Sequence, residues 1–262
     1  MACNGVAKRM LSPRYGYPTT TRRLRGKESE AFTRVELLAI IAALAFLGML
    51  ALPVLASNAT NSRLAQCFNN LRQIGIAYHQ WSDEHSQLFP WDIPVNDGGT
   101  RGGIAANAFI HFAALSNQLA AATHRILVCP SDSVKRPVES PDAFLSLTTQ
   151  NNSLSYFAGL HGNIEEPQEI LSGDRNLRTT TTLGPLCANV GVPASSLKPG
   201  DSSVAWTNAI HGRVGNLLLT DGAVHTVTSE KLREAVSKAE PRPEAATHIL
   251  IPGNPVAIPE GL

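Results

Sequence analysis

The stretch that decides how this chain is built runs from Ala31 to Ala56 and reads AFTRVELLAIIAALAFLGMLALPVLA. From residue 37 to residue 56 it contains no charged side chain. A helix that rises about 1.5 Å per residue crosses a hydrocarbon core of about 30 Å with about 20 residues. We therefore expect residues 32–56 to form a single transmembrane helix, with Glu36 at its edge, where a carboxylate needs a partner.

Charge is distributed unevenly on the two sides of this stretch. The 262 residues carry a formal net charge of +1. Residues 1–31 hold seven Lys and Arg against two Glu, which is 7 − 2 = +5, so the remainder carries 1 − 5 = −4. By the positive-inside rule, the basic segment stays in the cytoplasm and the residues after 56 lie outside it. No Lys/Arg cluster follows residue 57, so we expect no nucleic-acid binding.

The residues around Ala31 resemble a processing motif. Residues 31–38, Ala-Phe-Thr-Arg-Val-Glu-Leu-Leu, are similar to the prepilin cleavage and methylation motif of type IV pilins and type II secretion pseudopilins, in which Gly precedes Phe-Thr-Leu-x-Glu-Leu. The resemblance implies that a prepilin peptidase removes the cytoplasmic leader 1–31 by cleavage between Ala31 and Phe32. It also implies that Phe32 is then methylated on its new terminal amine. Ala31 stands where the family usually has Gly.

The same resemblance implies roles for residues within the span. Glu36 becomes the assembly residue, whose carboxylate faces the terminal amine of a neighbouring subunit, so that its charge is compensated on assembly. Pro53 lies where many family members have a proline that bends or breaks the helix. The residues alone also allow a simpler interpretation, in which Glu36 sits among the lipid head groups.

Residues 57–240 are expected to form a periplasmic domain attached to this span. The helical pattern continues from 57 to 84 and becomes amphipathic. Its apolar stripe consists of Leu64, Phe68, Leu71, Ile74, Tyr78 and Trp81. The expected fold is α+β and pilin-like. It has one long amino-terminal helix, transmembrane and then amphipathic, which packs on a small antiparallel β-sheet with long loops.

The rest of the domain reads as short strands and two further helical segments. The first helical pattern has one apolar face, formed by Ile104, Ala108, Phe112, Leu115 and Leu119. Strands are expected at 125–129, 153–158 and 203–207, and a β-hairpin at 215–228. The hairpin turns at Asp221-Gly222, and a helix is expected at 229–236 with Ser229 as its cap. The Pro-rich tail 241–262 reads as an extended, poorly packed end.

Several stretches of this domain resemble one branch of the same family, found widely in planctomycetes and verrucomicrobia. They are residues 67–77, Cys129-Pro-Ser-Asp132, Gly173-Asp-Arg-Asn-Leu177, and His211 with Asp221-Gly222, which spells His-x9-Asp-Gly. Side chains such as Asp132 and Asp174 suit turns, and we expect both to serve that role.

His211 and Asp221 allow a catalytic interpretation as well as a structural one. They could act as a base and its orienting carboxylate, or bind a metal. We expect a structural role, because no nucleophile lies in a recognisable motif such as GxSxG. In that interpretation His211 hydrogen-bonds across the hairpin, while Asp221 and Gly222 make its turn.

Cysteine usage is consistent with an oxidising compartment but does not reveal the pairing. Without the leader, Cys67, Cys129 and Cys187 remain, which suggests one disulfide and one buried thiol. Any of the three pairings is possible. No Cys/His spacing of the kind that zinc requires and no calcium loop is present, so we expect no metal and no cofactor.

The leading functional hypothesis is a non-enzymatic pilin-like subunit. The resemblance implies a single-pass protein of the inner membrane, with a cytoplasmic amino terminus and a periplasmic domain, that assembles into a filament. Its expected partners are the prepilin peptidase, other pilin-like subunits and an inner-membrane assembly platform. The alternative is a membrane-tethered periplasmic domain that binds a polysaccharide or another external ligand. Exposed aromatic side chains, such as Trp91 or Trp206, would support it, although such side chains more often lie in a core.

Overall fold

The computed structural model describes residues 32–102, 107–119, 123–140, 150–179, 186–187, 192–193, 195–239 and 247–253. Within the first range, the side chains of residues 50–59 are left out of the description. The expected leader 1–31, Ala31 at the expected cleavage site, and the side chains of Pro53 and Cys187 therefore lie outside the described residues.

The chain divides into two compact units, Met1–Ala51 and Leu52–Leu262. Helix α1, Arg34–Glu84, contributes to both. Where side chains are described, which leaves out 50–59, no helix has the length and apolar character needed to cross a membrane. The expected span 32–56 extends into that undescribed stretch.

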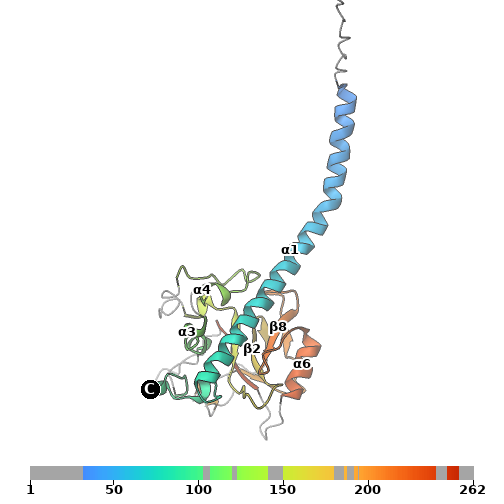
Figure 1. The fold of residues 1–262 in the computed structure, drawn as a ribbon. Helices are drawn as coiled ribbons and strands as arrows, with labels where there is room; N and C mark the ends of the chain where they lie inside the picture. Colours follow the sequence, from blue (N-terminus) through green and yellow to red (C-terminus); the bar gives the residue numbers. More distant parts are fainter. Residues whose placement is uncertain are drawn as a thin grey trace, which may run out of the picture. The chain divides into compact units, whose positions relative to one another are not determined.

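An antiparallel sheet forms the centre of the second unit (Figure 1). Its strand order is β6-β10-β1-β2-β8-β9, and all neighbouring pairs are antiparallel. The strands are β1 Tyr156–Gly159, β2 Ile170–Asp174, β6 Ser195–Leu197, β8 Val214–Leu219, β9 Val224–Thr228 and β10 Thr247–Leu250. Two small sheets pair β3 Leu177–Arg178 with β7 Ala205–Trp206, and β4 Leu186–Cys187 with β5 Val192–Pro193. The α+β class with a small antiparallel sheet is confirmed.

The other described helices are short. They are α2 Ala108–Ala113, α3 Ser116–Leu119, α4 Thr123–Ile126 and α6 Ser229–Lys238, with 3-10 turns η1 Pro90–Asp92, η2 Val95–Asp97 and η4 Gln150–Ser153. The predicted helix after the hairpin is confirmed as α6, but its cap is one residue earlier than expected. The Thr228 side chain accepts a hydrogen bond from the Lys231 amide, whereas the Ser229 hydroxyl accepts one from the Trp206 amide.

The second half of α1 covers one face of the sheet (Figure 1). Of the predicted stripe, Leu71, Ile74, Tyr78 and Trp81 are buried, while Leu64 and Phe68 are half-buried. The buried members share an apolar cluster with Tyr156 of β1 and Leu218 of β8. At Gly75 the helix lies so close to β8 that an added Cβ would be 2.8 Å from the Cδ1 atom of Leu218.

The opposite face of the sheet buries a second cluster under α6. Leu217 and Leu219 belong to it, together with Leu232 and Val236 of α6. Side chains alternate between the two faces of a strand, which explains why Leu218 contributes to the first cluster and its two neighbours to the second. The strand β8 is therefore buried on both faces, and the packing of Leu217, Leu218 and Leu219 fixes its register in the sheet.

The hairpin prediction at 215–228 is confirmed, whereas the strand predicted at 125–129 is not found. β8 and β9 pair around Asp221-Gly222. Residues 125–129 were expected to form a strand, but α4 ends at Ile126 and the chain then turns. The segment is buried from 126 to 129, and burial in a run this short does not distinguish a strand from the end of a helix.

The tail prediction is wrong for residues 247–250. They form β10, which lies between β6 and β1 and pairs with both. The alternation of Thr247, His248, Ile249 and Leu250 is typical of a strand, and the prolines on either side obscured it.

Candidate functional site

Large apolar side chains at residues 32–49, which comprise Phe32 and the described beginning of α1, are all exposed. Their exposed fractions run from 43% at Ile40 to 74% at Val35. The set is Phe32, Val35, Leu37, Leu38, Ile40, Ile41, Leu44, Phe46, Leu47 and Met49, which we call the apolar helix surface. Leaving such side chains in water costs about 1.5–3 kcal/mol each, so the ten side chains of this surface would cost about 15–30 kcal/mol if water covered them fully.

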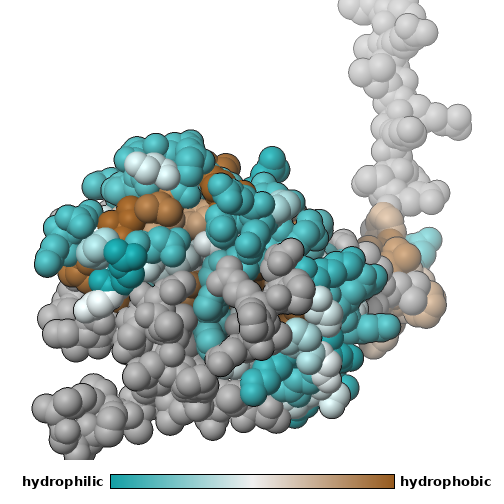
Figure 2. Space-filling view, turned by 90° about the horizontal axis from the view of Figure 1, so that it is seen from below, coloured by the Kyte–Doolittle hydropathy of each residue, from teal (hydrophilic) through white to brown (hydrophobic). Residues whose placement is uncertain are grey.

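The globular unit presents a different surface. Its large exposed apolar side chains among the described residues are few, namely Ile76, Leu88, Val95 and Val134. Figure 2 shows one face of the molecule, on which most of the coloured surface is hydrophilic. A helix that is apolar on all sides is normally covered by lipid or by other helices, whereas a mostly polar surface can face water.

Glu36 has a partner within its own chain at the start of α1. The Thr33 amide and hydroxyl donate to Glu36 Oε2 at 2.9 and 2.8 Å, and the Glu36 amide donates to the Thr33 hydroxyl at 3.2 Å. This reciprocal arrangement is a capping box. The sequence interpretation missed it, although the Thr-x-x-Glu spacing that predicts it is visible at residues 33–36.

A disulfide joins Cys67 of α1 to Cys129, which follows α4. The sequence left this pairing open. The bond closes a loop with a sequence separation of 62 and anchors α1 to the segment after α4. A disulfide of this kind persists in an oxidising compartment.

His211 packs against this disulfide. Its Nε2 atom lies 3.3 Å from Cys129 Sγ and 3.5 Å from Asp174 Oδ2. The side chain of His211 is 2% exposed and that of Asp174 is fully buried. The expectation that His211 hydrogen-bonds across the hairpin is therefore wrong, because the His211 side chain contacts Cys129 and Asp174 of β2 instead.

Asp174 ends β2 and does not cap a turn as expected. Its Oδ2 atom accepts a hydrogen bond from the Asn216 amide of β8 at 2.6 Å, while among the described residues its Oδ1 atom has no hydrogen-bond partner. Burial raises the pKa of Asp174 to about 7, although the hydrogen bonds from Asn216 oppose this shift. Burial also lowers the pKa of His211 to about 4, so its imidazole is neutral at pH 7.

Asp132 forms a second buried interaction beside this pair. Arg175 donates to it twice, with Nε–Oδ2 and Nη2–Oδ1 distances of 2.6 Å, and the Ser155 hydroxyl donates to Oδ2 at 2.8 Å. Burial opposes ionisation of Asp132, but the hydrogen bonds from Arg175 and Ser155 outweigh it and lower its pKa below the usual value. Asp132 also accepts from the Val134 amide at 3.1 Å, so its expected turn role is confirmed.

These residues form one buried cluster, defined here as Cys67, Cys129, Asp132, Asp174, Arg175 and His211. They belong to four separate segments of the chain, and each segment carries one of the stretches that resemble the pilin-like branch. The cluster therefore joins α1, the segment after α4, the end of β2 and the loop before β8. Only their contacts in the folded chain bring these stretches together.

Asp221 and Gly222 lie away from this cluster. Asp221 Oδ1 accepts from the Ala223 amide at 2.8 Å, and Gly222 has a φ of 81°, so the predicted turn role of both residues is confirmed. His211 precedes β8 and Asp221 follows it, and a strand of this length spans roughly 20 Å. The structure therefore does not support the pairing of His211 with Asp221 as a catalytic base and orienting group.

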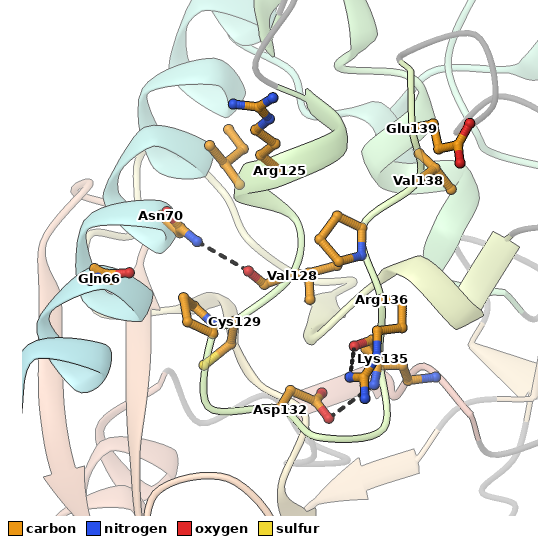
Figure 3. Close-up of a pocket in the computed structure, with 13 residues that line it drawn as sticks. Gln66, Asn70, Arg125, Val128, Cys129, Asp132, Lys135, Arg136, Val138 and Glu139 are labelled. Carbon is orange, nitrogen blue, oxygen red and sulfur yellow. Dashed lines mark hydrogen bonds between the residues drawn. The ribbon is translucent and has the colours of Figure 1, made fainter. Parts of the chain in front are cut away.

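A pocket of about 590 Å³ lies beside the disulfide (Figure 3). α1 contributes Gln66 and Asn70 to one wall, and residues 125–139 form the other. Asn70 Nδ2 donates to the carbonyl of Val128 at 3.3 Å, which ties the two walls together. Comparison of the whole chain with known proteins found no matching family model, curated protein or solved structure.

Proposed function

We propose that this chain is a pilin-like structural subunit, a pseudopilin, of a type II secretion or type IV pilus-like system. A prepilin peptidase removes the leader before Phe32, residues 32–56 hold the chain in the inner membrane, and the processed chain assembles into a periplasmic or surface filament. The observation that carries this proposal is the apolar helix surface, which needs lipid or neighbouring helices to cover it.

The apolar helix surface has different neighbours before and after assembly. In the membrane, lipid chains cover it; in a filament, the same helix of neighbouring subunits does. Lipid chains are as apolar as Leu, so the exchange involves little hydrophobic driving force, and packing and polar contacts decide it. Glu36, the acidic residue in the first turn of α1, is the group whose charge differs most between the two environments.

Two features of the second unit support the proposal. A long helix whose second half packs on an antiparallel sheet is the arrangement expected of a pilin-like domain. The Cys67–Cys129 disulfide is consistent with a domain outside the cytoplasm, in agreement with the charge distribution around residues 32–56. The subunit's partners are the prepilin peptidase, other pilin-like subunits and an inner-membrane assembly platform.

Processing is tested by determining the amino terminus of the mature protein from cells that contain a prepilin peptidase. We expect the mature chain to start at Phe32 and to carry one added methyl group, which mass spectrometry of the terminal peptide detects. The control is the same chain made without the peptidase, which should retain the leader 1–31. A mature chain that starts at Met1, or one that starts after Ala56, would refute the proposal.

Assembly is tested with variants that separate the two roles of Glu36. Glu36→Gln keeps the capping box, since Gln also fills this position, but removes the charge. Thr33→Val removes the cap and keeps the charge. We expect Glu36→Gln to be processed normally and to lose filament assembly, and Thr33→Val to retain it, as measured by cross-linking and pelleting of sheared filaments. Normal assembly of Glu36→Gln would show that Glu36 acts only as a cap.

The alternative function, a tethered ligand-binding domain, has no support from exposed tryptophan side chains. Trp91 and Trp206, whose exposure would have indicated a ligand-binding surface, are both buried in the apolar clusters. A tethered ligand-binding domain would have to use another surface, such as the pocket in Figure 3.

A further inference from the structure

Part of the buried cluster has the composition of a metal site. One ligand atom each of Cys67, Cys129 and His211 lies within 4.8 Å of the other two. Asp174 adds a carboxylate, whose Oδ2 atom lies 3.5 Å from the same Nε2 atom of His211. The Oδ1 atom of Asp174 is buried and has no hydrogen-bond partner among the described residues, although a buried polar atom normally has one.

The distances agree with those between ligands of a tetrahedral zinc ion. Zinc binds nitrogen and oxygen at about 2.0–2.1 Å and sulfur at about 2.3 Å, which places neighbouring ligand atoms about 3.3 Å apart for nitrogen and oxygen and about 3.5 Å apart for nitrogen and sulfur. The observed distances from His211 Nε2 are 3.5 Å to Asp174 Oδ2 and 3.3 Å to Cys129 Sγ. His211 therefore already has ligand spacing from two of the other three residues.

Two spacings differ from those of a bound zinc ion. Asp174 is not part of the group of ligand atoms that lie within 4.8 Å of one another, so its carboxylate has to approach the sulfur atoms. The two sulfur atoms, in turn, are too close together for a metal. They are bonded to each other in the disulfide, whereas two thiolates on one zinc ion lie about 3.8 Å apart. Breaking the disulfide removes this restriction, because the two Cys side chains, whose Cα atoms lie 4.9 Å apart, can then rotate and separate their sulfur atoms. Cys67 lies on a helix, and Cys129 lies in the turn that follows α4, where its carbonyl accepts a hydrogen bond from the Asp132 amide at 2.9 Å.

We propose that the dithiol form of this chain binds one zinc ion through Cys67, Cys129, His211 and Asp174, and that disulfide formation releases it. A dithiol reductant supplies two electrons and two protons to open the disulfide and becomes a disulfide itself. Each Cys thiol then transfers its proton to water as zinc binds. In the reverse direction, a disulfide oxidant accepts two electrons from the thiolates by thiol exchange, and Zn²⁺ leaves unchanged.

The chemistry of the ligands favours zinc over other divalent ions. Two thiolates, an imidazole and a carboxylate are ligands that zinc accepts in tetrahedral sites, while magnesium and calcium prefer oxygen ligands alone. The Asn216 amide already holds Asp174 by its Oδ2 atom, which provides the orienting contact that metal ligands usually have. The zinc form would hold the same four segments together before the disulfide exists, independently of whether the chain assembles into filaments.

The test uses the full chain in detergent, reduced with a phosphine under anaerobic conditions and freed of metal. Titration with Co²⁺ should give one ion per chain, with the visible absorption of tetrahedral cobalt and a thiolate charge-transfer band, and Zn²⁺ should displace it. The oxidised chain should show neither signal. His211→Ala and Asp174→Asn should each weaken Co²⁺ binding at least tenfold, and Cys67→Ser should abolish the charge-transfer band of a two-thiolate site. His225→Ala is the matched control, since His225 is exposed on β9, and it should bind as the unmodified chain does.

Two results would overturn the proposal. One is the absence of a tetrahedral cobalt spectrum in the reduced chain, and the other is unchanged affinity in both His211→Ala and Asp174→Asn. If the reduced metal-free chain is unfolded, circular dichroism replaces absorption as the readout. Zn²⁺ should then restore the far-ultraviolet signal of the folded chain, and failure to do so counts equally against the site.

Discussion

Removal of the Cys67–Cys129 disulfide tests how much the cluster contributes to folding. Its loop has a sequence separation of 62. The chain-entropy relation for a loop of this length gives a loss of about 4 kcal/mol in the free energy of unfolding when the bond is absent. Domains of ordinary size have about 5–15 kcal/mol in total, so the change is a large fraction of the whole. We expect Cys67→Ala/Cys129→Ala to fold but to be destabilised by about this amount.

Urea denaturation measures this loss. Trp81, Trp91 and Trp206 are all buried, so tryptophan fluorescence reports unfolding of the globular unit. Each single variant, Cys67→Ala or Cys129→Ala, also breaks the bond and should lose as much as the double variant. The unmodified chain under reducing, metal-free conditions should behave in the same way. This last comparison provides an internal control, since it changes no residue.

The reasoning would be refuted by a small effect. A loss below about 1 kcal/mol in the double variant would show that the segments are held in place mainly by other contacts. Losses that add between the two single variants would show that the side chains contribute separately rather than through their bond. Either result would contradict the role of the disulfide in anchoring α1 to the segment after α4.

Three further predictions concern single residues. Gly215→Ala places a Cβ 2.6 Å from the Trp206 ring and should lower the free energy of unfolding by about 1–3 kcal/mol in urea denaturation. Gly222→Val should cost about 1–2 kcal/mol because of its positive φ, whereas Gly222→Asn, which tolerates this conformation, should cost clearly less; equal losses would contradict the turn assignment. His211→Gln should reveal the titration of Asp174. Because the pKa of Asp174 is raised to about 7 in the folded state, the folded state binds more protons than the unfolded state. The free energy of unfolding should therefore fall, as the pH rises from 4 to 7, by up to about 1.4 kcal/mol per pH unit. In the unmodified chain this fall is offset up to about pH 6.5, because the pKa of His211 is lowered to about 4 in the folded state and its titration contributes a slope of opposite sign. A flat pH profile of stability in His211→Gln would contradict the raised pKa of Asp174.

Several elements could be predicted from the sequence because their signals are local. The hairpin follows from Asp221-Gly222 between two apolar runs, and α6 follows from a hydroxyl cap before an amphipathic pattern. The second half of α1 follows from its apolar stripe, since residues three and four apart share one face of a helix. The capping box of Thr33 and Glu36 has an equally local signal in the Thr-x-x-Glu spacing, although neither the assembly interpretation nor the head-group interpretation of Glu36 includes it.

Where local signals are ambiguous, the sequence predicted the wrong structure. The apolar run 125–129 is compatible with a strand and with the buried end of a helix, and the neighbours of α4 decide which one forms. The strand β10 is short and surrounded by prolines, and its pairing partners β1 and β6 lie far away in the sequence. Such pairings are decided by the sheet as a whole.

The opening stretch 31–56 and the buried cluster show which features the sequence determines and which depend on the tertiary structure. The sequence by itself determined that residues 37–56 are apolar and uncharged, because this is a property of consecutive residues. Only the tertiary structure decided that Cys67 pairs with Cys129 and that His211 lies against their disulfide and Asp174 rather than across the hairpin. Cys67 and Cys129 are 62 positions apart, and His211 lies further along the chain, so no local pattern encodes these contacts. They arise because packing of α1 on the sheet brings four distant segments to the same place.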